Sequence, residues 1–106
     1  MSGEIEELER WYEAQCDGDW EHEFGPRIET LDNPGWSIEI PLEGTLLEGR
    51  ALPPVEVRES ERAWMFCQVS EGKFRGAGGP LMLGRMLRVF LDWARAEQGE
   101  RNAGAP

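Results

Sequence analysis

The sequence predicts an α+β fold, with an antiparallel meander sheet of about five strands between an N-terminal and a C-terminal helix. Apolar residues recur at helical spacing near both ends of the chain. The middle alternates between apolar and polar residues and is divided by glycine and proline turns. We expect one domain over residues 1–98, since a chain of this length can bury one core, and a flexible tail over the small, polar residues 99–106.

The first helix is expected over residues 3–15, with Ser2 able to cap its start and Gly18 in the turn that follows it. Its first turn is acidic, which the helix dipole favours. The apolar residues that share one helical face are Ile5, Leu8, Trp11 and Tyr12.

The first strand is expected over residues 21–31, interrupted at Gly25-Pro26, which suggests an edge position or a bulge. Residues 32–35 (Asp-Asn-Pro-Gly) predict a turn. The next strand has one apolar and one polar face, which is typical of an antiparallel sheet with one face in water. Its apolar face consists of Trp36, Ile38, Ile40 and Leu42.

A loop over residues 43–54 precedes the other predicted strands, at residues 55–58, 63–69 and 73–76. The strand over residues 63–69 is apolar on both faces, which predicts that both are covered. We expect the glycines of residues 76–79 to turn the chain through their backbone freedom, because a phosphate-binding loop would also need a lysine. The second helix then presents an apolar stripe: Leu83, Met86, Leu87, Val89, Phe90, Trp93 and Ala94. The tryptophans that are in phase with apolar neighbours, and so predicted to lie in the core, are Trp36, Trp64 and Trp93.

The net charge of −10 is unevenly distributed. Residues 1–48 hold 14 acids and 2 bases, whereas residues 49–106 hold 7 acids and 9 bases. The acidic half should repel nucleic acid and anionic membranes and attract a basic protein surface. The alternative is that these acids serve solubility alone. The N-terminus lacks the basic and apolar order of a signal peptide, so we expect a cytoplasmic protein.

Residues 16–23 form the densest polar cluster, but no chemistry is complete there. The spacing of Asp17, Asp19 and Glu21 matches the start of a calcium loop, yet His22 and Ile28 occupy positions where that loop needs Gly and Glu. One histidine and two cysteines also leave zinc and other transition metals without a ligand set. We therefore expect no metal ion and no cofactor.

Catalytic residues are not predicted. Cys67 falls among core residues, and the acids beside Cys16 oppose formation of its thiolate. Acidic pairs are too common in this chain to identify a hydrolase. A small hydrolase or transferase that uses the Cys16–Glu23 cluster remains the alternative function.

A partner-binding surface is the other interpretation of this cluster, besides a turn in which the aspartates cap backbone amides. Trp20 lies between two acids and is expected to be a partly exposed anchor, of the type enriched in binding hot spots. The predicted binding residues are Asp17, Asp19, Trp20, Glu21, Glu23 and Glu29.

Several strings of residues resemble the immunity protein 53 family of bacterial polymorphic-toxin systems. They are Trp11-Tyr12, residues 15–22, Gly25, residues 28–36, Phe74, Gly76, residues 78–80 and residues 90–93. The resemblance covers about residues 8–95 and departs from the family pattern at both ends and in the loop from Glu43 to Pro54. It implies a non-enzymatic antidote that neutralises a cognate toxin by stoichiometric blocking. The resemblance leaves the toxin's chemistry open. Nucleases are the obvious candidates for a basic toxin, because their active sites must attract phosphates.

Overall fold

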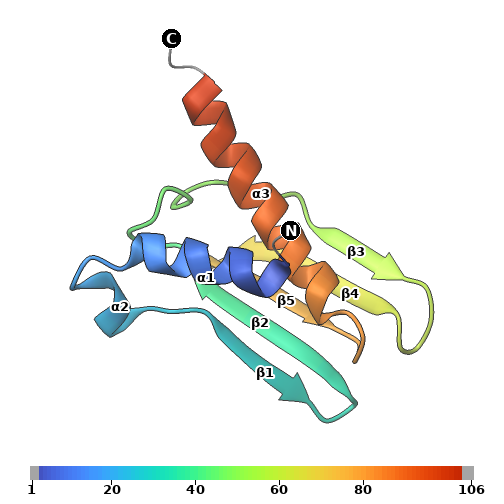
Figure 1. The fold of residues 1–106 in the computed structure, drawn as a ribbon. Helices are drawn as coiled ribbons and strands as arrows, with labels where there is room; N and C mark the ends of the chain where they lie inside the picture. Colours follow the sequence, from blue (N-terminus) through green and yellow to red (C-terminus); the bar gives the residue numbers. More distant parts are fainter. Residues whose placement is uncertain (1–2, 104–106) are drawn as a thin grey trace.

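The computed structural model describes residues 3–103, with side chains described for residues 3–98, and it confirms the α+β fold (Figure 1). Helices α1 and α3 lie on the same face of one five-stranded antiparallel sheet. The elements are α1 (Glu4–Gln15), α2 (Trp20–Glu23), β1 (Arg27–Leu31), β2 (Gly35–Pro41), β3 (Val55–Arg58), β4 (Trp64–Ser70), β5 (Lys73–Gly78) and α3 (Leu83–Ala103).

The strand order, β1-β2-β5-β4-β3, departs from a simple meander at one connection. The chain leaves β2, crosses to β3 at the far edge, and returns through β4 to β5, which pairs with β2 in the middle of the sheet. Strands β1 and β3 are therefore the two edges. The predicted turn at residues 32–35 joins β1 to β2, as the sequence indicates.

The core lies between the sheet and the two helices. Every second residue of β2 faces the helices, so Ile38 and Ile40 are buried, and Trp36 is half-buried at the end of this row. The side chains that are almost wholly removed from water include Ile38, Ile40, Leu42, Leu47, Cys67, Phe74, Met86, Leu87 and Phe90. Burial of such apolar surface is the main source of stability in a domain of this size.

The prediction that both faces of the strand at residues 63–69 are covered is wrong. Met65 and Cys67 are buried beneath the helices, whereas Phe66, on the opposite face, is 36% exposed. Trp64 is half-buried on that same open face and not in the core, in contrast to Trp93, which is buried and donates its indole N–H to the carbonyl of Ala51. The helices of the described chain cover one face of the sheet alone.

The expected strand over residues 21–31 is wrong in its first part. Residues 20–23 form the short helix α2, and the strand begins only at Arg27. The helical turn is favoured because carboxylates close the loop before it and because Trp20 gains burial by turning inward.

The glycines at residues 76–79 do not provide the backbone freedom that we expected, because none of them has a positive φ. They are needed where another part of the backbone comes too close for a side chain. A Cβ on Gly79 would overlap the carbonyl oxygen of Arg62, and one on Gly78 would lie 3.0 Å from the carbonyl oxygen of Trp64. Glycine therefore lets the chain pass tightly beside the start of β4 on its way to α3.

At the N-terminus, the expected cap Ser2 lies outside the described residues, and Gly3 occupies the N-cap position of α1. The backbone N–H of Gly3 donates to the Glu6 carboxylate at 3.3 Å. Helix α3 extends to Ala103, and the boundary predicted between residues 98 and 99 stays a prediction. Within the described chain, no helix has the length and apolar character needed to span a bilayer.

Candidate functional site

The segment that links α1 to α2 is held by two of the predicted site residues. Asp17 Oδ1 accepts the backbone N–H groups of Asp19 and Trp20, both at 2.9 Å. The Glu21 carboxylate accepts the N–H groups of Asp17 and Gly18, also at 2.9 Å. Asp17 therefore caps two backbone N–H groups in the turn that leads into α2, which is the alternative that the sequence left open for it.

These hydrogen bonds stabilise the charged carboxylates. The N–H of Trp20, and then that of Asp19, lowers the pKa of Asp17 below its ordinary value. The pKa of Glu21 is also lowered, first by its own backbone N–H and then by those of Asp17 and Gly18. Both side chains shape the surface as well as carrying its charge, so replacing them would change the loop itself.

Trp20 is not the partly exposed anchor that we expected. Its side chain is buried, at 6% exposure, and its indole N–H donates to the carbonyl of Glu43 at 2.8 Å. The ring centroid lies 6.1 Å from those of Trp11 and Tyr12 and 5.9 Å from that of Phe24. The flanking acids do not make a tryptophan exposed, because neighbouring residues on a helix point in different directions.

Asp19, Glu23 and Glu29 are exposed, as the prediction requires. Glu21 and Glu23 line a hollow of about 520 Å³ beside Pro41 and Lys73. Glu29 lines a second hollow, of about 340 Å³, on the open face of the sheet. Arg27 and Glu39 line both hollows, so the two hollows are neighbours, with Glu21 and Glu23 in one and Glu29 in the other.

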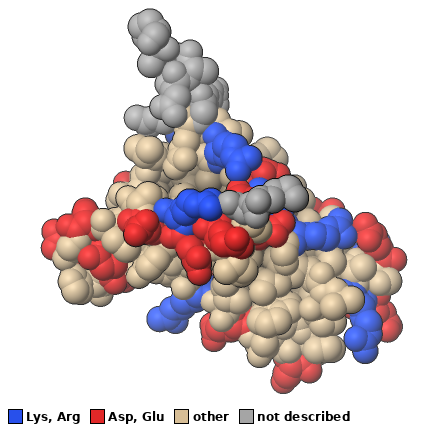
Figure 2. All heavy atoms as spheres, viewed as in Figure 1, with Lys and Arg blue, Asp and Glu red and all other residues tan. Residues whose placement is uncertain are grey.

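The acids of the N-terminal half are not all available to a partner, because some are paired with bases from the C-terminal half. Glu39 lies 3.3 Å from Lys73 Nζ and 3.5 Å from Arg75 Nη1. Glu4 lies 3.6 Å from Arg88. Figure 2 shows that acidic side chains nevertheless gather along α1 and at the end of the molecule where α1 leads into α2.

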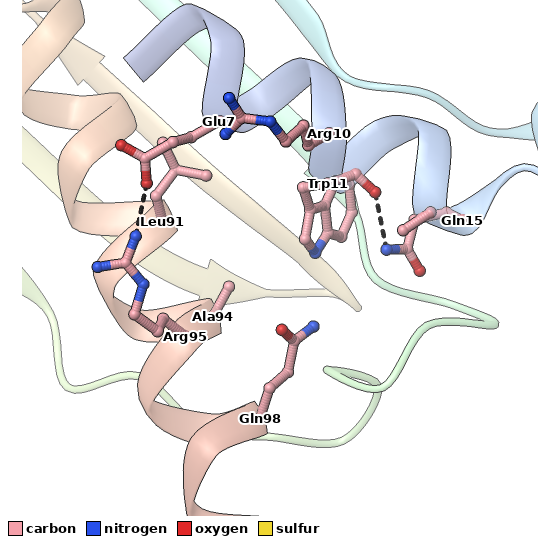
Figure 3. A pocket seen from close by; sticks show the side chains of 9 residues that line it. Glu7, Arg10, Trp11, Gln15, Leu91, Ala94, Arg95 and Gln98 are labelled. Carbon is pink, nitrogen blue, oxygen red and sulfur yellow. Dashed lines mark hydrogen bonds and ion pairs between the residues drawn. The ribbon is translucent and has the colours of Figure 1, made fainter. Parts of the chain in front are cut away.

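Glu7 is the most heavily paired of these acids and joins α1 to α3 (Figure 3). Its carboxylate accepts hydrogen bonds from Arg88 Nη2 at 2.5 Å and from Arg95 Nη2 at 2.7 Å. The hydrogen bond from Arg88 is the main reason that the pKa of Glu7 is lowered. This arrangement neutralises charge where the two helices meet.

A cavity of about 320 Å³ lies beside this ion pair, between α1 and α3. In Figure 3 the indole nitrogen of Trp11 points into it, and this N–H has no hydrogen-bond partner among the described residues. The side chains around it are those of a helix interface, and its described lining contains no cysteine, histidine or serine that could act as a nucleophile or base.

The alternative of an enzyme built on residues 16–23 gains no support from the geometry. The Cys16 thiol donates to the Tyr12 carbonyl at 3.3 Å, and His22 lies on the exposed side of α2. Burial raises the pKa of the Cys67 thiol to about 11, which keeps it protonated and poorly nucleophilic. Over the part of the chain that the structure covers, no three Cys, His, Asp or Glu side chains are grouped as metal ligands.

Sequence reasoning missed an apolar patch beside the acidic surface. Ile5, Tyr12 and Ile28 are 52%, 38% and 36% exposed, although the sequence places the first two on the same apolar helical face as Leu8 and Trp11, which are buried. The spacing contained the necessary information: at 3.6 residues per turn, Ile5 and Tyr12 are only about 20° apart around the helix, but Ile5 and Trp11 are about 120° apart. One side of the stripe is buried, and the other is not.

The fold defines the class of protein first: a small α+β domain in which two helices cover one face of an antiparallel sheet. The chain matches the family described as Immunity protein 53 over residues 5–95, and it therefore belongs to the immunity protein 53 family. The resemblance noted in the sequence is thus confirmed. No curated protein and no solved structure matches the chain.

Proposed function

We propose that this protein neutralises a cognate toxin by binding it stoichiometrically, without catalysis of its own. The observation that carries the proposal is the family match, which extends over residues 5–95 and so includes the whole sheet, almost all of α1 and the first part of α3. Cys67 is buried, and Asp17 and Glu21 hold the backbone of the α1–α2 segment. Because these groups serve the fold, they favour binding over the alternative of catalysis by residues 16–23.

The proposed contact surface is the corner formed by the α1–α2 segment and β1. Asp19, Glu23 and Glu29 supply exposed charge, and Asp17 and Glu21 hold the loop that carries it. Trp20 stays within the assignment only as a buried support beneath this corner. A basic toxin surface is the complementary partner, whereas nucleic acid and anionic membranes would be repelled.

Co-expression tests the function. The cognate toxin domain, sought among the genes beside that of this chain, is expressed in bacterial cells with and without the chain. We expect the cells to survive only when the chain is present, and the two proteins to co-purify in equal amounts. Survival without a complex, accompanied by a chemically altered toxin, would favour the enzymatic alternative.

Charge reversal tests the surface. The triple variant Asp19→Lys/Glu23→Lys/Glu29→Lys changes only exposed acids for which the structure shows no hydrogen bond to the loop. At low salt we expect association with the toxin domain to slow by about tenfold, and the difference to shrink as salt is added. The matched control, Glu56→Lys/Glu59→Lys/Glu61→Lys, makes the same change in net charge at exposed acids of β3 and the loop after it, at the opposite edge of the sheet, and should slow association much less. Equal effects of the two variants would mean that net charge alone steers the toxin.

A further inference from the structure

An apolar groove runs between α1 and β1, beside the acidic corner. Ile5, Leu8 and Tyr12 line it from α1, and Pro26 and Ile28 line it from the chain that enters β1 and from β1 itself. The groove has a volume of about 350 Å³. Three of its large side chains are more than one third exposed. Contact of this apolar surface with water is unfavourable, and a bound partner would remove it from water.

The groove lies along an open sheet edge. Strand β1 pairs with β2 on one side only, and among the described residues no strand lies on its other side. Figure 1 shows β1 at the rim of the sheet, beyond α1. Such an edge presents backbone donors and acceptors that can pair with an added strand.

The opposite edge, β3, differs in how its apolar side chains are covered. Val55 and Val57 of β3 are half-buried and packed against the core. In β1, Ile28 lies opposite the buried Ile38 and faces the same side of the sheet, yet it is 36% exposed. The helix layer therefore covers β3 better than β1, and of the two edge strands in the described part of the chain it is β1 that has an exposed apolar groove beside it.

Acidic side chains border the groove on its solvent side. Glu9 lines it directly. On the helical wheel, Glu6 and Glu13 follow Glu9 toward solvent, and all three are exposed. An occupant of this groove would therefore have to carry apolar residues for the groove and basic residues for its rim.

We propose that an extended segment of the toxin binds along β1 as a sixth strand, with an apolar side chain in the α1–β1 groove and basic side chains against Glu9 and its neighbours. This inference rests on the proposed function and adds to it the mode of contact and the kind of segment recognised. Main-chain hydrogen bonds supply the pairing, and the groove supplies the selectivity for side chains. The apolar anchor that the sequence assigned to Trp20 is instead provided by Ile5, Tyr12 and Ile28.

The test uses as its probe the same toxin domain, purified, that the co-expression experiment uses. The variant Ile5→Gln/Ile28→Thr removes apolar surface from the groove while keeping a good helix former in α1 and a β-branched residue in β1. Its matched control, Leu46→Gln/Leu81→Gln, removes two apolar side chains that are 54% and 84% exposed elsewhere. We expect the groove variant to bind about tenfold more weakly, through faster dissociation, and the control to bind like the unmodified chain.

Hydrogen exchange on the complex supplies the second measurement. We expect the amides of residues 27–31 to gain protection on binding and those of β3 to remain unchanged. A groove variant that binds normally, or binding without protection of β1, overturns the inference and leaves the proposed function intact. A concentration-dependent dimer that the groove variant abolishes, with toxin binding unaffected, also overturns it, because the occupant would then be a second copy of the chain. Failure of the unmodified chain to bind the toxin domain removes both proposals together.

Discussion

The two sides of α1 differ in a way that separates stability from recognition. Toward α3 the helix buries Trp11, and its Glu7 is joined to arginines of α3. Toward β1 the same helix leaves Ile5 and Tyr12 exposed, beside further acids. The side of α1 that faces α3 is matched by α3 in both shape and charge. The side that faces β1 has exposed apolar and acidic side chains that the described chain does not cover. The apolar and acidic side chains that α1 leaves uncovered therefore indicate the properties of a partner, which are apolar and basic side chains.

The largest expected effect of a substitution is on stability, at Trp20. Trp20→Ala removes a buried indole and leaves the Glu43 carbonyl without its donor, so we expect the free energy of unfolding to fall by about 3–5 kcal/mol. Urea denaturation measures this change. Toxin binding should fall only in proportion to the folded fraction; a fully folded variant that has lost binding would restore Trp20 as a direct contact.

A smaller effect is expected at Glu7, and it should depend on pH. Because its pKa is lowered in the folded protein from an ordinary value of 4.5, the unfolded chain binds the proton first on acidification. The contribution of the Glu7 carboxylate to the free energy of unfolding is thus complete above pH 4.5 and is lost as the pH falls through the lower pKa of the folded state. We expect Glu7→Gln to be less stable than the unmodified chain at neutral pH, and the difference to narrow in acid. Denaturation midpoints from about pH 3 to pH 7 check this, and a difference independent of pH would contradict the role of the Glu7–Arg88 pair.

Asp17 and Asp19 should differ although they are two residues apart. Asp17→Ala removes the acceptor of two backbone N–H groups and should lower Tm by a few degrees, less than Trp20→Ala does. Asp19→Ala should leave Tm nearly unchanged, because its side chain caps no backbone group. Thermal unfolding followed by circular dichroism compares the two variants, and equal losses would show that Asp19 also holds the loop.

A small effect on stability is also expected in the groove. Ile5→Gln/Ile28→Thr changes side chains that are already 52% and 36% exposed, so its unfolding free energy should change by less than about 1 kcal/mol. The same urea denaturation checks it. A large loss would mean that the groove belongs to the folding core and would remove the separation between the two sides of α1.

Local patterns in the sequence were enough to predict much of the fold. The alternation from Trp36 to Leu42 identified β2, and the spacing of Ile5, Leu8 and Trp11 identified α1. The turn at residues 32–35 followed from its proline and glycine. These predictions succeeded because each depends on neighbouring residues alone.

The rest depended on contacts between distant residues. The pairing of β2 with β5 is fixed by partners such as Ile40 and Phe74, which no local pattern identifies. Phe66 is as apolar as its neighbours, and only the position of the helices shows that its face is open. Trp20 was misassigned for a related reason, since its hydrogen bond to Glu43 joins segments 23 residues apart.

The central claim, neutralisation by binding at the corner of α1, α2 and β1, is tested most directly by titrating the purified toxin domain with this chain in a calorimeter while toxin activity is followed. We predict that binding and inhibition saturate together at one chain per toxin. The Asp19→Lys/Glu23→Lys/Glu29→Lys variant should require a higher concentration to reach the same end point, and the Glu56→Lys/Glu59→Lys/Glu61→Lys control should not. Inhibition that is complete at a small fraction of one chain per toxin would contradict stoichiometric blocking, and equal titrations for the two variants would contradict the assigned surface.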